Sequence, residues 1–231
     1  MKKLKKQHLI ILNIIIFIGV SLVFAQDRVR EVFAKKGYNP LSGVTIVVDP
    51  GHGGKDAGAM RGDINEQDIN LSISLKLKTM LEENGATVIL TRDGAYDLAS
   101  ENADNRKRED MQKRVEIING DTSDLFISIH LNSYPNTSVK GAQAFYQRDN
   151  YASKYLANIV QGNLQKLTGT KMVEKSGDYY LLNNSKKPGI LVECGFISNE
   201  EDRGNLIQDS YQEKIAAHLL DSILEFFEVL L

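Results

Sequence analysis

The sequence predicts an α/β fold, in which helices flank a mainly parallel sheet within a single domain. Short apolar runs alternate with longer segments of helical periodicity, as expected when each helix returns the chain to the same edge of a sheet. The 231 residues, of which 42% are hydrophobic, are enough for a substantial core. No internal repeat or low-complexity tract interrupts the alternation.

The predicted elements follow one another in regular order after an N-terminal segment of different composition. Strands are expected at residues 44–49, 86–91, 125–130, 142–146 and 190–194. Helices are expected at residues 67–84, 103–119, 151–167 and 211–231. The first of these helices has an apolar stripe that includes Ile69, Ile73 and Leu77, and Gly85 marks its end.

The helix at 103–119 carries charges that are spaced for pairing along its own length. Glu109 is placed to meet Lys113, and Asp110 is placed to meet Arg114, in each case one turn further on. Charges of alternating sign are typical of a helix face in contact with water. We therefore expect both pairs to be solvated.

The segment before the first strand reads as an export signal followed by a linker. Four lysines precede the apolar stretch from Leu9 to Ala25, which is typical of residues that direct a chain across a membrane. As a helix this stretch would span about 25 Å, slightly less than the roughly 30 Å hydrocarbon core. Residues 1–25 are therefore either a cleaved signal peptide or an N-terminal membrane anchor, residues 26–43 a linker, and residues 44–231 a single globular domain.

The overall charge excludes one class of partner. The formal net charge is -2 and the pI is about 6.1, so the chain has no surplus of Lys and Arg with which to neutralise the phosphates of a nucleic acid. The glycines between residues 51 and 58 do not form a nucleotide loop either. Asp56 stands where a dinucleotide fingerprint needs Gly, and Lys55 lacks the spacing of a P-loop lysine.

Four residues that could perform metal or proton chemistry come from four separate segments: His52, Glu66, His130 and Glu193. Ligands of open α/β sheets bind beyond the carboxyl ends of the strands, where we expect these residues to meet. Taken singly, either histidine could equally be structural, and Glu66 could simply favour a helix N-terminus. Glu193 ends an apolar run, and a buried carboxylate there needs a cation or a catalytic role. Two histidines and a carboxylate are one of the ligand sets of catalytic zinc, which also needs a proton shuttle.

Segments of characteristic sequence surround these residues in a fixed order. They are VVDPGHGGKDAGA at 47–59, Glu66 at the start of a helix, DLFISIHLN at 124–132 and ILVECGFISN at 190–199. Together they resemble the zinc-dependent N-acetylmuramoyl-L-alanine amidases, the type-3 amidase family of bacterial cell-wall hydrolases. The resemblance extends from about Val44 to Phe227.

This resemblance implies a fold, a reaction and a set of site residues. The fold is a six-stranded sheet flanked by helices, and the reaction is hydrolysis of the amide between N-acetylmuramic acid and L-alanine in peptidoglycan. His52, Glu66 and His130 would hold one Zn²⁺, and Glu193 would be the catalytic acid and base. We further expect Asp49 to orient His52, and Asn132 to bind the substrate.

The chain departs from the family pattern just before the last motif. Relatives commonly have Leu-Arg-Asn where this chain has Leu182-Asn183-Asn184, so a basic contact to the acidic peptide stem is missing or is supplied by Lys186 or Lys187. Cys194 replaces the usual small or apolar neighbour of the catalytic glutamate. Strand alternation predicts that its side chain is buried on the side opposite Glu193.

The organisation of the chain is similar to that of the spore-formers' amidase, which strips peptide stems from cortex muramic acid before muramic δ-lactam forms. The similarity consists of an export segment and a catalytic domain without wall-binding repeats. It implies a location outside the cytoplasmic membrane: extracellular, in the cell wall or in the forespore intermembrane space. The alternatives are a vegetative autolysin, or a silent homologue that binds peptidoglycan or a protein partner. Relatives that a protein partner activates suggest such a partner here.

Overall fold

The computed structural model describes residues 39–230 of the chain. Pro40–Leu231 is one compact unit. The predicted export segment and nearly all of the predicted linker lie outside the described residues. Within the described part of the chain, no helix combines the length and the apolar character that crossing a membrane would need. Leu41 is already fully buried, and its N–H donates to the carbonyl of Asn84, 3.0 Å away.

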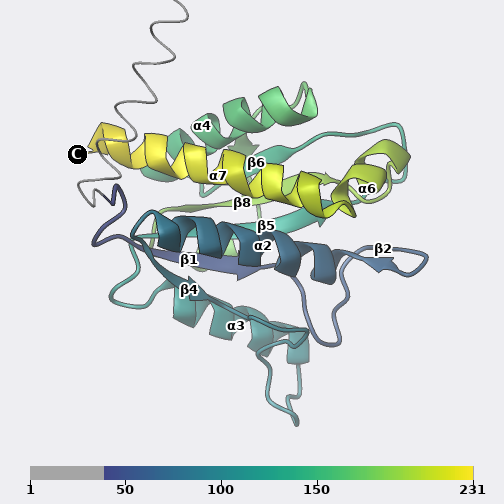
Figure 1. Ribbon diagram of the computed structural model, residues 1–231. Helices are drawn as coiled ribbons and strands as arrows, with labels where there is room; N and C mark the ends of the chain where they lie inside the picture. Colours follow the sequence, from purple (N-terminus) through teal and green to yellow (C-terminus); the bar gives the residue numbers. More distant parts are fainter. Residues whose placement is uncertain (1–38, 231) are drawn as a thin grey trace, which may run out of the picture. The chain divides into compact units, whose positions relative to one another are not determined.

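A six-stranded sheet forms the centre of this unit (Figure 1). Its strands are β1 (Thr45–Pro50), β4 (Thr87–Leu90), β5 (Leu125–Asn132), β6 (Gln143–Tyr146), β7 (Lys175–Ser176) and β8 (Gly189–Phe196). Their order across the sheet is β4-β1-β5-β8-β6-β7, and the first four are parallel. Strand β6 is antiparallel to β8, and β7 is parallel to β6. The predicted α/β class and mainly parallel sheet are therefore confirmed.

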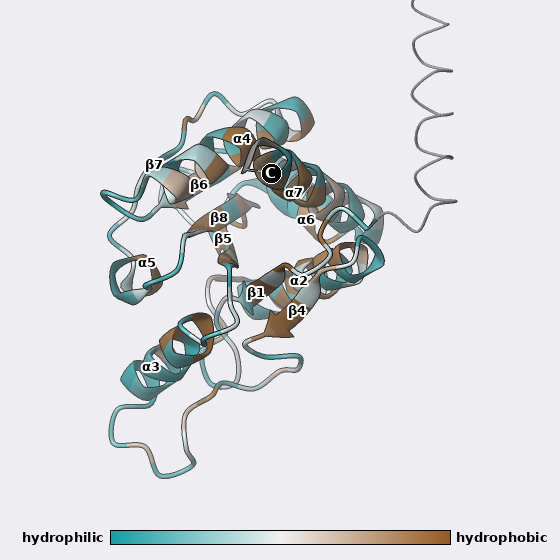
Figure 2. Ribbon diagram, turned by 90° about the vertical axis from the view of Figure 1, so that its left-hand side faces the viewer, coloured by the Kyte–Doolittle hydropathy of each residue, from teal (hydrophilic) through white to brown (hydrophobic). Residues whose placement is uncertain are grey.

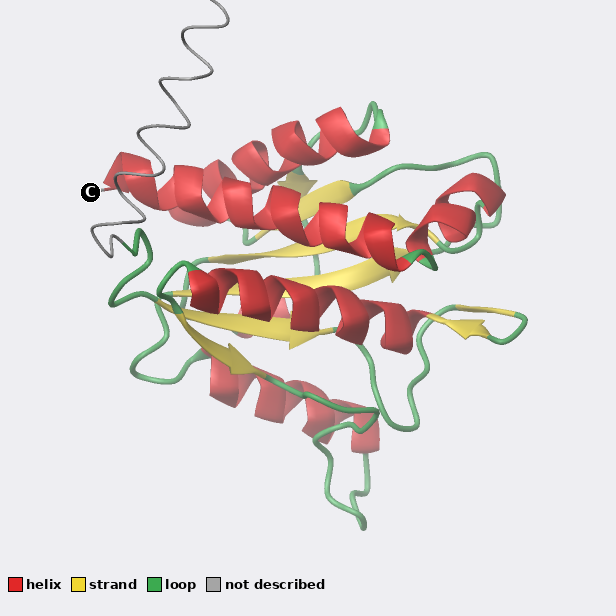
Figure 3. Cartoon of the chain, in the orientation of Figure 1, coloured by secondary structure: helices red, strands yellow, loops and turns green. Residues whose placement is uncertain are grey.

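Helices cover both faces of the sheet, as Figures 1 and 3 show. The helices are α2 (Glu66–Glu83), α3 (Arg106–Ile118), α4 (Tyr151–Thr168), α5 (Tyr180–Asn184), α6 (Glu200–Leu206) and α7 (Asp209–Leu230). On one face, α2 and α4 pack on the strands and α7 packs against both helices. On the other face, α3 packs on β1 and α5 packs on β8. The two-residue strands β2 (Met60–Arg61) and β3 (Ile64–Asn65) form a small hairpin beside the sheet.

The core divides into two clusters because successive strand residues point to opposite faces. In β1, Ile46 and Val48 belong to the larger cluster beneath α2, α4 and α7. Val47, between them, belongs to the smaller cluster beneath α3 and α5. In Figure 2 the strands are largely brown, the colour of hydrophobic residues, whereas α3 is largely teal. Cys194 is buried in the larger cluster, as its alternation with Glu193 predicts.

Each of the nine elements that the sequence predicts is present. Their ends differ by up to three residues, because caps rather than apolar spacing set the helix boundaries. Asn65, Asn105 and Asn150 begin α2, α3 and α4, and each side chain accepts a hydrogen bond from the backbone N–H three residues later. The sequence analysis missed β2, β3, β7, α5 and α6, which are all too short to show a period.

One prediction about α3 is wrong. The pair Glu109–Lys113 is partly exposed, as expected, with 2.9 Å between its charged atoms. The pair Asp110–Arg114 is buried instead: the Arg114 side chain is 1% exposed and lies 3.0 Å from the Asp110 carboxylate. Charge spacing along one helix does not reveal that a neighbouring loop covers one of the two pairs.

Two glycines differ in how much space surrounds their Cα atoms. A Cβ at Gly189 would lie 2.0 Å from the Phe126 ring, whereas a Cβ at Gly162, inside α4, meets nothing within 4 Å. We expect Gly189→Ala to lower the free energy of unfolding by about 1–3 kcal/mol through overpacking. Gly162→Ala should raise it by about 0.5–1 kcal/mol, because alanine is the better helix former. Urea denaturation measures both, and equal midpoints for the two variants would contradict this packing.

Candidate active site

The structure brings the four candidate residues to one edge of the sheet. His52 follows β1, Glu66 is the first residue of α2, and His130 lies near the carboxyl end of β5. Glu193 in β8 is the register partner of His130. Parallel strands end at the same edge, so residues that are far apart in the sequence meet in space as predicted.

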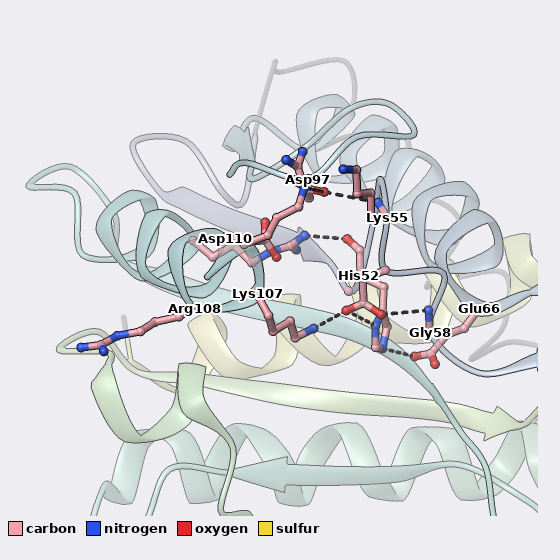
Figure 4. A network of polar contacts seen from close by, with 12 residues as sticks. His52, Lys55, Gly58, Glu66, Asp97, Lys107, Arg108 and Asp110 are labelled. Carbon is pink, nitrogen blue, oxygen red and sulfur yellow. Dashed lines mark hydrogen bonds and ion pairs between the residues drawn. The ribbon is translucent and has the colours of Figure 1, made fainter. Parts of the chain in front are cut away.

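His52, Glu66 and His130 form a tight cluster. The ring nitrogens His52 Nε2 and His130 Nδ1 each lie 3.1 Å from the same oxygen, Glu66 Oε1. The two rings approach edge to face with centroids 5.0 Å apart. One ligand atom from each of the three residues lies within 4.8 Å of the others, close enough to share a metal ion. Figure 4 shows His52 directed toward Glu66.

Backbone donors hold the Glu66 carboxylate in place. Oε2 accepts a hydrogen bond from the N–H of Ala59 at 2.9 Å, and Oε1 accepts one from the N–H of Leu131 at 3.0 Å. Burial opposes ionisation of Glu66, but hydrogen bonds from His130 and His52 outweigh it and hold the pKa of Glu66 well below its usual range. The cluster therefore contains a permanent negative charge.

The His52 ring has a second carboxylate behind it. Its Nδ1 lies 3.0 Å from the Asp56 carboxylate, on the side of the ring away from Glu66. Burial favours the neutral imidazole, but the hydrogen bonds to Asp56 and Glu66 raise the pKa of His52 to about 9. The ring thus lies between two carboxylates, an environment that favours positive charge.

The His52 backbone is fixed by two buried arginines. Its φ angle is +62°, in the left-handed region that residues with a side chain rarely adopt. Arg114 donates to the carbonyls of Pro50 and His52 at 2.8 and 2.5 Å. Arg92 donates to those of Pro50, Gly51 and His52 at 3.0, 2.8 and 2.7 Å. Because both side chains are 1% exposed, the loop that carries His52 is tied to the interior.

Asp49 acts on this loop, but not in the way that the sequence predicts. Its carboxylate accepts hydrogen bonds from Arg114, Thr91 and Ser128 at 2.7, 2.6 and 2.6 Å. The residue at the His52 ring is Asp56 instead. Asp49 therefore positions His52 through the Arg114 guanidinium. Burial disfavours the charged form of Asp49, but the Arg114 charge outweighs this effect and holds the pKa of Asp49 below its usual value.

Glu193 lies beside the cluster in a different electrostatic environment. It is 7% exposed, and its Oε2 atom has no hydrogen-bond partner among the described residues. Its Oε1 atom is 3.5 Å from the hydroxyl of Tyr179, whose ring packs edge-on against Phe145. Burial raises the pKa of Glu193 to about 7, with the charge of Glu66 adding to the effect and the histidines opposing it. A carboxyl group with this pKa can both take and give a proton near neutral pH.

All four residues line one cavity with a volume of about 680 Å³. Asn132, the predicted substrate contact, also lines it, and its side-chain oxygen accepts a hydrogen bond from the N–H of Ser133. One wall comes from α3 and includes Arg108 and Met111, and the facing wall comes from α5 and includes Leu181. The volume lies within the range of cavities that bind small organic ligands.

The sequence analysis missed several residues that support this site. Asp56 could have been found, because it lies four residues after His52 in the same glycine-rich segment. Arg92 also carries a signal, since it follows the end of β4 at the catalytic edge. No signal in the sequence marks Tyr179 or the role of Arg114. The contact of Tyr179 with Glu193 depends on a loop, and the spacing of Arg114 from Asp110 is that of a surface ion pair.

A doubly covered α/β sheet with a His–Glu–His cluster and an adjacent buried carboxyl group is an arrangement typical of hydrolases. Comparison with known proteins narrows this class. Residues 46–225 match the family of N-acetylmuramoyl-L-alanine amidases, and the chain belongs to that family. The resemblance in the sequence motifs is thereby confirmed, as is the expectation of an amidase that hydrolyses a cell-wall amide.

Relatives along most of the chain carry the same activity in their names. The germination-specific N-acetylmuramoyl-L-alanine amidase of Bacillus subtilis (strain 168) is 39% identical over 195 residues, which are 81% of each chain. N-acetylmuramoyl-L-alanine amidase LytC of the same organism is 34% identical, over 82% of this chain and 36% of LytC. The CwlD amidase of Clostridioides difficile, solved in complex with the GerS lipoprotein, is 37% identical with a TM-score of 0.78, over 80% of this chain and 99% of that one.

The buried arginine of α3 can be tested by substitution. We expect Arg114→Gln to lower the free energy of unfolding by about 3–5 kcal/mol, because Asp49 and Asp110 would remain buried without their counter-charge. Urea denaturation measures the change. Arg114→Lys should lose less because it keeps the charge, and Lys113→Gln, one residue earlier on the outer face, should leave the midpoint nearly unchanged. Equal midpoints for Arg114→Gln and wild type would show that the contacts of Arg114 do not stabilise the loop that carries His52.

Proposed function

We propose that the enzyme is a zinc hydrolase, in which His52, Glu66 and His130 hold one Zn²⁺ and Glu193 moves the proton. The bond it cleaves joins N-acetylmuramic acid to L-alanine in peptidoglycan. The observation that carries the proposal is that a cluster of two histidines and a carboxylate shares a cavity with a second carboxyl group of raised pKa. The family match supports the choice of substrate.

The cluster fits zinc by its chemistry. Imidazole nitrogens and carboxylate oxygens are its usual ligands in hydrolases, where three protein ligands leave a position free for water or substrate. Asp56 would keep the proton on His52 Nδ1, so that Nε2 remains available on the side of Glu66. When bound, zinc supplies Lewis-acid activation of the amide carbonyl and of water.

The protein itself performs the proton transfers. Ionised Glu193 accepts a proton from the attacking water at Oε2, the oxygen without a partner among the described residues. It then delivers this proton to the departing nitrogen of L-alanine, because an amine leaves poorly as an anion. The Tyr179 hydroxyl lies 3.5 Å from Oε1 and so occupies that oxygen, which leaves Oε2 for the exchange of the proton. The two carboxyl groups differ in role because Glu66 stays ionised and Glu193 titrates.

Substitutions separate metal binding from proton transfer. We expect Glu193→Gln to retain zinc and to lose about 10²- to 10⁴-fold in kcat, because only the proton shuttle is removed. His52→Ala and His130→Ala should lose both zinc and activity. Metal analysis of the purified variants, together with mass spectrometry of digested peptidoglycan, measures both quantities. Full release of peptide stems by Glu193→Gln would refute the role of this residue.

We further propose that the enzyme acts in sporulation, where it removes peptide stems so that cortex muramic δ-lactam can form. The similarity to the germination-specific amidase, over 81% of both chains, supports this role over that of a vegetative autolysin. The complete set of His52, Glu66, His130 and Glu193 argues against a silent homologue. The site of action would lie outside the cytoplasmic membrane, in the wall or the forespore intermembrane space, and cell-wall relatives support this location.

A protein partner is part of the same proposal. Its support is that the similar CwlD amidase of Clostridioides difficile was solved in complex with the GerS lipoprotein. The anchoring or cleavage of the N-terminal segment concerns residues outside the described range.

Complementation tests the sporulation role. A Bacillus subtilis strain without its germination-specific amidase would receive this chain or its Glu193→Gln variant. Wild-type chain should restore muramic δ-lactam in the spore cortex, as measured by muropeptide analysis, and the variant should not. The alternative outcome is that the purified enzyme hydrolyses vegetative wall but the complemented spores contain no muramic δ-lactam. That result would favour the role of a vegetative autolysin.

A further inference from the structure

The described residues that line the catalytic cavity include three Lys or Arg side chains, all from α3. Lys107 pairs with Asp56 next to the His52 ring. Arg114 is buried between Asp49 and Asp110. These two cations are neutralised by carboxylates of the protein itself.

Arg108 differs from the other two. Its side chain is exposed, lines the cavity and makes no ion pair or hydrogen bond with the described residues. Its backbone N–H is occupied by the Asn105 cap, which fixes its place on the helix. In Figure 4 the side chain extends away from the carboxylates around His52. Its guanidinium thus has no counter-charge among the described residues, at a position that borders the cavity.

The stability of α3 does not account for this cation. Arg108 lies in the first turn of α3, where the helix dipole disfavours positive charge. The two neighbouring cations of that turn are each compensated: Arg106 lies 2.8 Å from Asp97, and Lys107 pairs with Asp56. The helix N-terminus and Arg108 thus add their positive potentials at the same place, and both favour an anion.

The facing wall, which comes from α5, contributes no Lys or Arg to the described lining of the cavity. Asn183 in α5 donates to the Asp178 carboxylate at 2.7 Å. Neither of the expected substitutes, Lys186 and Lys187, lines the cavity. Lys187 lies 3.4 Å from the carbonyl of Asp121 instead. Among the described residues that line the cavity, a free cation is found on α3 and not on α5.

We propose that Arg108 binds a carboxylate of the peptide stem, and that it thereby determines the specificity of the cleft for acidic over amidated stems. The proposal rests on the proposed function, since it assigns the stem to this cavity. A guanidinium suits the task because its planar fork meets both oxygens of a carboxylate. The site is exposed to water, so the interaction should affect substrate binding more than the chemical step.

The test uses zinc-loaded enzyme and two forms of one substrate. Glycan strands carry L-alanyl-D-glutamate stems, with their carboxylates either free or amidated. Wild type should have the lower KM for the acidic form. Arg108→Gln should raise that KM about 5- to 20-fold with kcat nearly unchanged, and should treat the amidated form as wild type does. Arg108→Lys, which keeps the charge but not the fork, should fall between them.

Matched measurements separate this effect from others. Lys113→Gln removes one positive charge from the same helix outside the cavity, and should leave both KM values unchanged. Zinc content and melting temperature of Arg108→Gln should equal those of wild type. An equal rise in KM for both substrates, or no rise for either, would overturn the proposal while the amidase remained active.

A binding measurement keeps the proposal separate from the proposed function. Glycan strands of both forms are titrated into zinc-loaded Glu193→Gln and into the Glu193→Gln, Arg108→Gln double variant. Tighter binding of acidic strands that depends on Arg108 would support carboxylate recognition even if the wild type cleaved neither substrate. In that case the proposed reaction, and not the role of Arg108, would be refuted. Equal affinities of the two proteins for acidic strands would refute the role of Arg108.

Discussion

The catalytic edge depends on the hold that two buried arginines have on the backbone after β1. The carbonyls of residues 50–52 all accept hydrogen bonds from side chains, and buried carbonyl groups need donors. Arg92 and Arg114 supply them, and Asp49 balances the charge that they bring into the interior. These contacts offset the strain of the left-handed conformation of His52. The position of the half-buried His52 ring is thus supported by ionic groups in the core.

The two glutamates of the site, Glu66 and Glu193, differ in their chemical role because their environments differ. Glu66 receives hydrogen bonds from backbone amides and histidines, so it stays charged. Glu193, at a similar depth, has an apolar strand around it and an oxygen without a partner among the described residues, so its proton is held far more tightly. Two glutamates of equal intrinsic acidity therefore serve as a fixed negative charge and a mobile proton carrier.

Much of this arrangement follows from local sequence. The class of fold, the strands and the meeting of His52, Glu66, His130 and Glu193 follow from periodicity and from the rule that parallel strands end at one edge. The partners of these residues do not follow. Asp49 turned toward Arg114 rather than His52, and Asp110–Arg114 proved buried, because both depend on which loop covers α3. Tertiary contacts of this kind leave no periodic trace in the sequence.

The burial of Leu41 fixes the place at which the described chain enters the domain. Leu41 is tied to Asn84, at the end of α2 opposite Glu66, and 18 helical residues separate the two ends by about 27 Å. The chain thus enters the domain at its rear, behind the amino ends of the parallel strands. The point where the described chain enters the domain and the mouth of the cavity therefore lie at opposite ends of α2.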